Sequence, residues 1–396
     1  QATDIFAGIR LADFDAALEQ GGIEYIGQDT IEALYENIKA QSVRPGLCKT
    51  AGLKLVYSPL NGSGLVPVTR VLGDIGITDI TIVPEQQYPD GNFPTCPYPN
   101  PEIREALALG LALAEKSGAD LMLATDPDAD RVGIAVNHHG EYILPTGNEV
   151  GVLMLDYIAK QRIAQGTMPK NPIAVKSIVS TPLADVVAKS YGIQMINVLT
   201  GFKYIGEQIT LLEQKGEENR FLLGFEESYG YMTGGHVRDK DAVNGAMIIC
   251  EMAEYYKKQG KTLIDALNDI FSRFGVYAAK VKGYTFEGTE GMDKMTGIMK
   301  KLRENPPKDF GGYKILCCSD YLISKRRDFR SGGQTDILLP TSNVLEYDLE
   351  NNLKLIVRPS GTEPKIKVYL TIVTNDKAQV ETIEQRLISS ADLLMK

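Results

Sequence analysis

Three aspartates spaced two residues apart are the sharpest chemical feature of this sequence. Asp126, Asp128 and Asp130 lie in the run D-P-D-A-D-R, directly after a predicted buried strand. Carboxylates at this spacing in a curled loop can converge on one point, and Mg²⁺ prefers oxygen ligands. An EF-hand loop also begins D-x-D-x-D, but it needs glycine where Arg131 stands and glutamate where Asn137 stands. The run predicts a Mg²⁺ site, with an acidic solvated turn as the alternative.

A second polar loop, G-F-E-E-S-Y-G at 224–230, also follows a predicted strand. Glu226 and Ser228 are two residues apart, so both side chains can face one side and hydrogen-bond the neighbouring hydroxyls of a sugar. An ordinary strand-to-helix turn is the alternative. The run T-G-F-K, which begins at Thr200, is a fainter candidate for sugar or phosphate contacts.

Two further loops carry cations that suit phosphate. H-V-R-D-K-D at 236–241 interleaves cations with carboxylates, although this run taken alone favours a solvated charged face over a functional site. A lysine there becomes a useful acid or base only if its surroundings lower its pKa. R-P-S-G-T-E-P-K at 358–365 offers a guanidinium, two hydroxyls and a glycine that lets backbone N–H groups approach an anion. A plain hairpin turn is its alternative.

Two other runs carry no such prediction. N-G-S-G at 61–64 follows a strand, but Pro67 replaces the third glycine of a dinucleotide-binding fingerprint. His138 and His139 are adjacent in a polar turn, and a chain with three histidines gives thin support for a zinc site.

The elements that position these loops are predicted from alternating apolar runs and amphipathic stretches, which are typical of strand–helix units around a largely parallel sheet. Such sheets bind ligands at the carboxyl ends of their strands. Strands are predicted at 53–57, 80–83, 121–124, 173–179, 195–198 and 221–224. Helices are predicted at 102–116, from about 149 with Asn148 as N-cap, and at 183–191, 204–212 and 242–259.

The pattern of predicted strands and helices changes after about residue 274. Longer strands and a hairpin at 344–357 alternate with helices at 292–303 and 376–395. We therefore expect an α/β protein in which two related mixed α/β sheet domains are followed by a smaller α+β C-terminal domain. The predicted divisions are 1–20, 21–146, 147–274 and 275–396.

Composition narrows the classes of function. Lys and Arg number 42 against 51 Asp and Glu, a net charge of −9, which disfavours broad nucleic-acid binding. No apolar run approaches the roughly 18 residues of a transmembrane helix. Five cysteines in 396 residues form neither a disulfide framework nor a zinc pattern, so reduced thiols and a cytoplasmic location are expected.

Taken in order, the four loops resemble those of the α-D-phosphohexomutase superfamily, and the glutamate pair at 226–227 most resembles the phosphoglucomutase branch. P-D-G-N-F-P at 89–94 and P-N-P-E at 99–102 match this family too. The resemblance covers nearly the whole chain and implies domains around one deep cleft. Pro127 and Ala129 depart from the glycines that the family often has between its aspartates.

The resemblance also implies a role for each loop. Asp126, Asp128 and Asp130 would bind Mg²⁺, with Arg131 beside a phosphoserine. Thr200 and Gly201 would help distinguish two bound orientations, and Glu226 and Ser228 would hold sugar hydroxyls. Arg238 and Lys240 would lie near the reacting group, with Lys240 as the proton carrier. The substrate's idle phosphate would be held by Arg358, Ser360, Gly361 and Thr362.

The implied activity is transfer of a phosphoryl group between the C1 and C6 oxygens of a hexose, interconverting glucose 1-phosphate and glucose 6-phosphate through a bisphosphate. Hexose 1,6-bisphosphate would act as activator. Phosphomannomutase or phosphopentomutase specificity, and a non-catalytic sugar-phosphate binding module, are the alternatives. The family's nucleophile is a serine in a T-A-S-H-N-P-like loop, which this sequence lacks. We therefore expect a chain without the N-terminal phosphoserine domain, inactive by itself.

Overall fold

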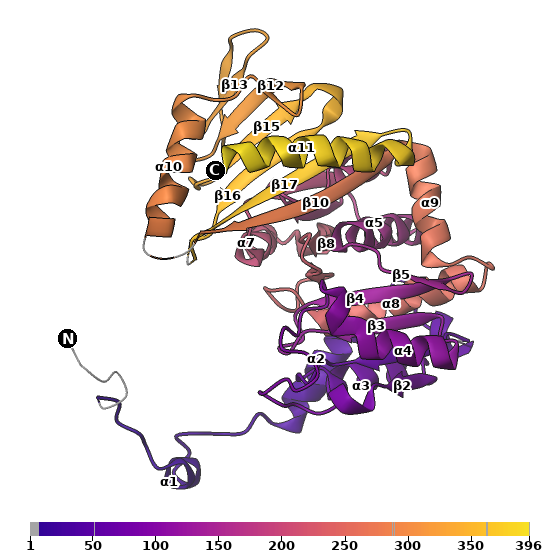
Figure 1. The fold of residues 1–396 in the computed structure, drawn as a ribbon. Helices are drawn as coiled ribbons and strands as arrows, with labels where there is room; N and C mark the ends of the chain where they lie inside the picture. Colours follow the sequence, from indigo (N-terminus) through magenta and orange to yellow (C-terminus); the bar gives the residue numbers. More distant parts are fainter. Residues whose placement is uncertain (1–7, 51, 287, 289, 362, 396) are drawn as a thin grey trace.

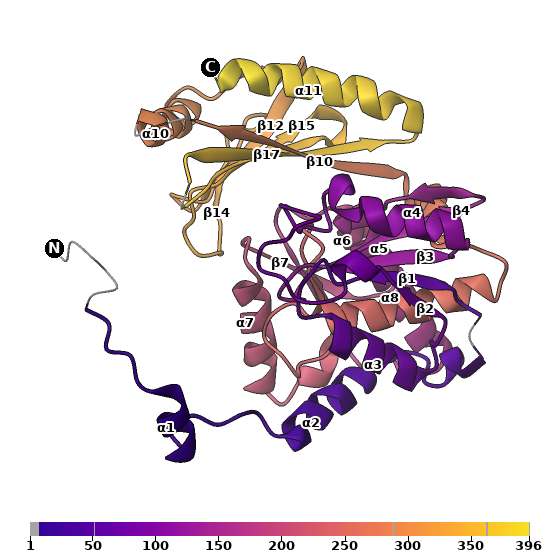
Figure 2. The same ribbon diagram turned by 60° about the horizontal axis from the view of Figure 1, so that its bottom comes forward.

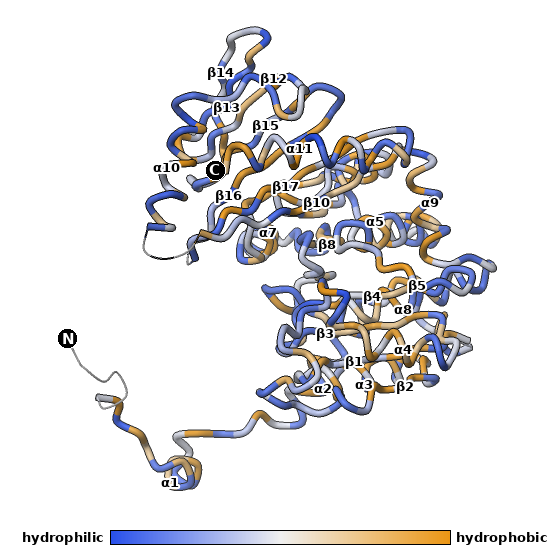
Figure 3. The backbone as a smooth tube through the Cα atoms, viewed as in Figure 1, coloured by the Kyte–Doolittle hydropathy of each residue, from blue (hydrophilic) through white to orange (hydrophobic). Residues whose placement is uncertain are grey.

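Three sheets with flanking helices make up the computed structural model, which describes residues 8–50, 52–286, 288, 290–361 and 363–395. Figure 1 shows two of the sheets stacked with helices between them and the third lying above. Figure 3 shows hydrophobic residues along the strands and the facing helices, and hydrophilic residues on most connecting loops. Among the described residues, no helix has the length and apolar character needed to cross a membrane.

The first sheet has five strands in the order β2-β1-β3-β4-β5. Strands β2, β1 and β3 run parallel, whereas β3, β4 and β5 are antiparallel. Because β3 ends at Thr125, the aspartate loop begins at its carboxyl end. The strands are β1 (Leu55–Ser58), β2 (Ile80–Ile82), β3 (Leu121–Thr125), β4 (Val132–His138) and β5 (Glu141–Ile143), and the helices are α2 (Gln28–Lys39), α3 (Leu65–Ile75) and α4 (Ala108–Ser117).

The second sheet has four strands in the order β7-β6-β8-β9, parallel except for β9. Loops 199–201 and 226–230 follow the carboxyl ends of β7 and β8. The strands are β6 (Ile173–Ser177), β7 (Gln194–Val198), β8 (Phe221–Phe225) and β9 (Tyr231–Met232). The helices are α5 (Gly147–Ala164), α6 (Leu183–Ser190), α7 (Phe202–Glu213), α8 (Ala242–Lys257) and α9 (Leu263–Phe274).

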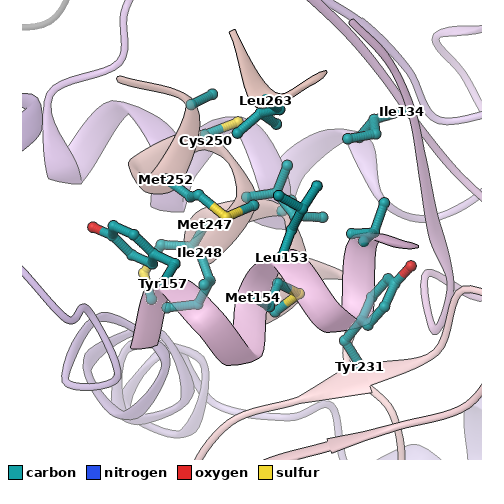
Figure 4. Packing of buried hydrophobic residues seen from close by; sticks show 14 of the residues in the cluster. Ile134, Leu153, Met154, Tyr157, Tyr231, Met247, Ile248, Cys250, Met252 and Leu263 are labelled. Atoms are coloured by element: carbon teal, nitrogen blue, oxygen red, sulfur yellow. The ribbon is translucent and has the colours of Figure 1, made fainter. Parts of the chain in front are cut away.

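One hydrophobic core serves both of these sheets. Helix α8 follows the second sheet in the chain yet packs against α3, β3 and β4 of the first. Figure 4 shows Met247 and Ile248 of α8 among Leu153 and Tyr157 of α5, with Ile134 of β4 nearby. Burial of such side chains removes apolar area from water at about 25 cal/mol per Å². The shared core therefore holds the loops of the two sheets in a fixed relation.

The third sheet is antiparallel and lies above the other two sheets in the view of Figure 2. Its strand order is β10-β17-β16-β15-β12-β13-β14, with β11 paired to β12, and α10 (Glu290–Glu304) and α11 (Val380–Leu394) complete a separate core. The strands are β10 (Val276–Thr285), β11 (Asp309–Phe310), β12 (Tyr313–Asp320), β13 (Lys325–Asp328), β14 (Gln334–Asp336), β15 (Leu345–Leu349), β16 (Lys354–Pro359) and β17 (Lys365–Thr374).

A small apolar cluster joins the third sheet to the second. Ile178 and Leu199, which follow β6 and β7, pack with Ile356 of β16 and Tyr369 of β17. These contacts bring the hairpin loop between β16 and β17 to the same side of the molecule as the loops of the second sheet.

The predicted fold class is confirmed, and one local prediction is wrong. The N-cap of α5 is Thr146, whose side chain and that of Glu149 form a capping box, while Asn148 accepts a hydrogen bond from the Thr181 N–H. Helix α1 (Phe14–Glu19) buries none of its residues and lies apart from the sheets in both views. The divisions at 20, 146 and 274 stay predictions.

Candidate active site

The three aspartates converge, as their spacing predicts. One carboxylate oxygen from each of Asp126, Asp128 and Asp130 lies within 4.8 Å of the other two. The loop curls because Ala129 adopts a left-handed backbone conformation, with φ of 55°. Asp126 fixes the curl, since its Oδ1 accepts the N–H groups of Asp130 at 3.0 Å and Arg131 at 2.9 Å.

The N-G-S-G run at 61–64 packs against the aspartate loop and holds it in place. This role was not predicted from the sequence. The N–H and hydroxyl of Ser63 both donate to the Pro127 carbonyl, at 2.8 and 3.0 Å. A Cβ on Gly62 would lie 2.3 Å from the Pro127 Cα, so only glycine allows this approach. The signal was present as a glycine-rich turn after β1, at the same sheet edge as β3.

The burial and mutual repulsion of the three aspartates favour binding of a hard divalent cation. Burial raises the pKa of Asp126 to about 7, and the negative charges of Asp130 and Asp128 add to the rise against the hydrogen bond from Arg131. Asp130 Oδ1 is buried and accepts no hydrogen bond from the described residues. Crowded carboxylates, one of them with an oxygen that accepts no hydrogen bond and lies 3.7 Å from Arg131 Nε, fit a cation that prefers oxygen ligands.

Lys240 lies against the same cluster. Its ammonium is 2.7 Å from Asp130 Oδ2 and 3.1 Å from Asp239 Oδ1. The Ala242 N–H donates to the Ala129 carbonyl at 3.1 Å, which ties the start of α8 to the aspartate loop. Burial would lower the pKa of Lys240, but hydrogen bonding to Asp130 raises it above its ordinary value. Lys240 is therefore held as a protonated donor, not as a base.

The loops after β7 and β8 meet through Glu226. Its Oε1 accepts the Gly201 N–H at 2.9 Å, and both burial and the neighbouring Glu227 raise its pKa. Thr200 carries a buried hydroxyl without a hydrogen-bond partner among the described residues. Ser228 is half-buried in the same loop. The predicted grouping of sugar-binding candidates thus presents a carboxylate and two hydroxyls together.

Charged groups from all three sheets meet near Arg131, and sequence reasoning assigned no role to most of them. Arg131 lies 3.6 Å from Glu102 and 3.8 Å from Asp126. Burial raises the pKa of Glu227, which accepts the Ser177 hydroxyl at 3.1 Å, while the charge of Lys367 on β17 opposes the rise. Glu102 closes the P-N-P-E run, which was the available signal for it.

The phosphate-loop candidates lie in the hairpin between β16 and β17. Burial raises the pKa of Tyr369 to about 12, although a hydrogen bond and the charge of Arg358 oppose the rise. The charges of Glu227 and Glu226 also act on Tyr369, which lies in β17 and packs with Leu199 after β7. The Ser360 N–H donates to the Lys365 carbonyl at 2.7 Å, and Gly361 is exposed. Thr362 lies outside the described residues.

Arg238 takes a different position from its neighbours in H-V-R-D-K-D. Its exposed guanidinium pairs with Glu213 at the end of α7 and donates to the Gly235 and Val237 carbonyls. The structure thus groups the aspartates, Arg131, Lys240 and the 200–228 candidates, and directs Arg238 toward α7.

Comparison with known proteins matches each of the three sheet units. Residues 31–140 match the phosphoglucomutase/phosphomannomutase alpha/beta/alpha domain II, 146–274 match its alpha/beta/alpha domain III, and 318–390 match its C-terminal domain. Phosphoglucomutase of Staphylococcus saprophyticus is 33% identical over 379 residues, covering 95% of this chain and 66% of the relative. Phosphoglucomutase of Staphylococcus aureus is 37% identical over 328 residues, covering 83% of this chain and 58% of the relative.

Solved structures share the fold. Parafusin, a phosphoglucomutase from Paramecium in its open form, aligns with a TM-score of 0.63 and 19% identity over 93% of this chain and 61% of its own. A phosphoglucomutase/phosphomannomutase family protein from Burkholderia thailandensis aligns with a TM-score of 0.58 and 15% identity over 93% of this chain and 71% of its own. The chain spans about three fifths to two thirds of the length of the curated relatives above. It belongs to the phosphoglucomutase/phosphomannomutase family of the α-D-phosphohexomutase superfamily.

Proposed function

We propose that this chain supplies the metal, sugar and phosphate sites of a phosphoglucomutase-type phosphotransferase, which interconverts glucose 1-phosphate and glucose 6-phosphate through glucose 1,6-bisphosphate. The convergence of the aspartate triad, Lys240 and Glu226 at one edge of two sheets is the observation that carries this proposal. The names of the curated relatives support glucose as the sugar. A cytoplasmic location is part of the proposal, and the five free cysteines support it.

The metal would be Mg²⁺, held by Asp126, Asp128 and Asp130. When bound, it would neutralise negative charge on the transferring phosphoryl group. Arg131, beside the triad, would add a second positive charge for the same oxygens. Lys240, kept protonated by Asp130, would donate a proton to the sugar oxygen as its bond to phosphorus breaks.

The substrate would be oriented by three loops that do not take part in bond making. Glu226 would accept hydrogen bonds from sugar hydroxyls, with Thr200, Gly201 and Ser228 completing the sugar site. Arg358, Ser360, Gly361 and Thr362 would hold the phosphate that is not being transferred, since an arginine fork matches phosphate oxygens. Arg238 is proposed for phosphate contact once it leaves Glu213. The sugar stereochemistry decides between phosphoglucomutase and its phosphomannomutase or phosphopentomutase alternatives.

The phosphoryl acceptor would be a serine outside these loops. Among the 396 residues no serine stands in a T-A-S-H-N-P-like setting, so we propose that they alone do not complete the reaction. Without a phosphoserine segment, the 396-residue chain would bind sugar phosphates but would not convert them.

A coupled assay of glucose 1-phosphate conversion tests this proposal. With Mg²⁺ and glucose 1,6-bisphosphate, the 396-residue chain should show no turnover above buffer. Adding a separately produced, phosphorylated serine domain of the Staphylococcus saprophyticus phosphoglucomutase should restore turnover, and an Asp128→Asn chain should restore none. Turnover by the chain alone would reveal an unrecognised nucleophile. Equal turnover by parent and Asp128→Asn chains would contradict the assigned metal site.

A further inference from the structure

Two histidines and an aspartate meet on the opposite side of the shared core, far along β4 from the aspartate loop. His138 ends β4 and His139 forms the turn to β5, while Asp265 lies in the first turn of α9. One ring nitrogen of each histidine and one Asp265 oxygen lie within 4.8 Å of one another. In Figure 1, β5 lies beside the end of α9 where these residues come together.

The turn is what allows adjacent histidines to face the same way. Successive residues of a strand point to opposite faces of the sheet. His139 leaves the strand with a φ of 56°, and its ring centroid lies 4.3 Å from that of His138. Both imidazoles therefore turn toward Asp265, a placement that the sequence spacing alone does not indicate.

Hydrogen bonds orient two of the three ligands. Thr262 donates its hydroxyl to Asp265 Oδ2 at 3.0 Å and lies 2.9 Å from His138 Nδ1. Because the Thr262 hydroxyl donates its proton to Asp265, the Thr262 oxygen accepts a hydrogen bond from His138 Nδ1–H. The other ring nitrogen of His138, Nε2, then keeps its lone pair. A metal-binding histidine commonly donates its other ring N–H in this way.

Two lysines near the cluster form ion pairs with carboxylates other than Asp265. Lys257 pairs with Asp120 at 2.6 Å, and Lys261 pairs with Asp269 at 2.5 Å. A cavity of about 230 Å³, lined by His139 and Thr262 among others, adjoins the cluster.

We propose that His138, His139 and Asp265 bind a borderline divalent metal ion such as Zn²⁺. Two imidazoles and one carboxylate form a ligand set that suits Zn²⁺ and leaves a fourth position for water, whereas Mg²⁺ prefers oxygen ligands. Zn²⁺–ligand bonds of about 2.0–2.1 Å need ligand atoms about 3.4 Å apart. The three ligand atoms lie within 4.8 Å of one another, so metal binding requires small side-chain movements. The ion would cross-link the β4–β5 hairpin of the first sheet to helix α9, which follows the second sheet.

Titration with Co²⁺, whose visible absorption reports histidine ligation, tests the proposal. The chain would carry Asp128→Asn and be kept in excess Mg²⁺, so that the aspartate triad takes no Co²⁺. We expect saturation at one equivalent, displacement of the absorption by Zn²⁺, and a Zn²⁺-dependent rise in Tm, because a ligand that binds the folded state stabilises it.

Two variants identify the ligands without removing the local structure. His139→Asn keeps a residue that tolerates positive φ, and Asp265→Asn keeps a capping side chain on α9. Each should weaken Co²⁺ binding by at least about tenfold. Asp293→Asn, the same substitution at an exposed position in the first turn of α10, is the matched control and should bind as the parent does. Failure of the parent to bind one equivalent, or equal binding by the Asp265 and Asp293 variants, would overturn the proposal.

Discussion

At the scale of single residues, ionising the aspartate triad is costly because Asp126 is buried and lies next to two further carboxylates. Burial raises the pKa of Asp126 to about 7, above the value near 4 of an unfolded chain. A carboxyl group with a raised folded-state pKa contributes stability that is present below about pH 4 and is lost as pH rises through about 7. The metal-free protein is therefore penalised at neutral and alkaline pH.

Asp126→Asn should reverse this penalty. In Mg²⁺-free buffer at pH 8, we expect the variant's free energy of unfolding to exceed the parent's by about 1–3 kcal/mol, with no gain at pH 4. Urea unfolding at the two pH values measures the difference. Saturating Mg²⁺ should favour the parent, because only the parent binds it tightly. An equal stability difference at both pH values would contradict the raised pKa.

Lys240 and a metal ion share one carboxylate, so they should compete. The ammonium lies 2.7 Å from Asp130 Oδ2, and an ion at the triad must displace it or share it. We expect Lys240→Met to tighten Mg²⁺ binding by about fivefold, equivalent to about 1 kcal/mol, and Asp128→Asn to abolish it. Calorimetry measures both.

Lys39→Met is the matched control, since it breaks a Lys–Asp pair between α2 and α3. It should leave the Mg²⁺ affinity unchanged. A Lys240→Met chain that binds Mg²⁺ more weakly than the parent would show that the ammonium supports the site.

At the scale of elements, the turn after β1 acts as a template for the aspartate loop. Gly62→Ala would place a Cβ 2.3 Å from the Pro127 Cα, so the loop must shift. Mg²⁺ affinity should fall at least about tenfold, as it does when outer supports of a metal site are lost. Gly73→Ala on α3, where an added Cβ meets nothing within 4 Å, should bind Mg²⁺ normally. Normal binding by both variants would mean that the turn does not position the loop.

The sequence predicted best those elements whose signals are local. Buried strands such as β3 and β8 show continuous apolar runs, and the loops that follow them carry the polar residues that were singled out. The N-cap of α5 was predicted at Asn148, although Thr146 and Glu149 form the T-x-x-E pattern of a capping box. The Asn148 side chain instead accepts the Thr181 N–H. The glycine-rich turn after β1 is visible in the sequence, but its contact with Pro127 and the Glu227–Lys367 interaction join segments far apart in the chain, which the sequence does not pair.

At the scale of the whole molecule, elements that follow one another in the chain do not always pack in the same unit. Helix α8 follows the second sheet but packs against the first, so a substitution in its core would disturb both sheets. The third sheet has its own core and meets the second through Ile178, Leu199, Ile356 and Tyr369. This contact joins the sheet that carries the Arg358 hairpin to the segments that follow β6 and β7.

Calorimetry of glucose 6-phosphate binding in saturating Mg²⁺ tests the central claim that loops from separate sheets form one substrate site. We predict a single binding event for the 396-residue chain, weakened at least about tenfold by either Arg358→Ala or Glu226→Gln, because each loses hydrogen bonds that involve a charged group. Arg327→Ala, an exposed arginine on β13 of the same sheet as Arg358, should bind like the parent. Parent-like binding by both the Arg358 and Glu226 variants would contradict the account.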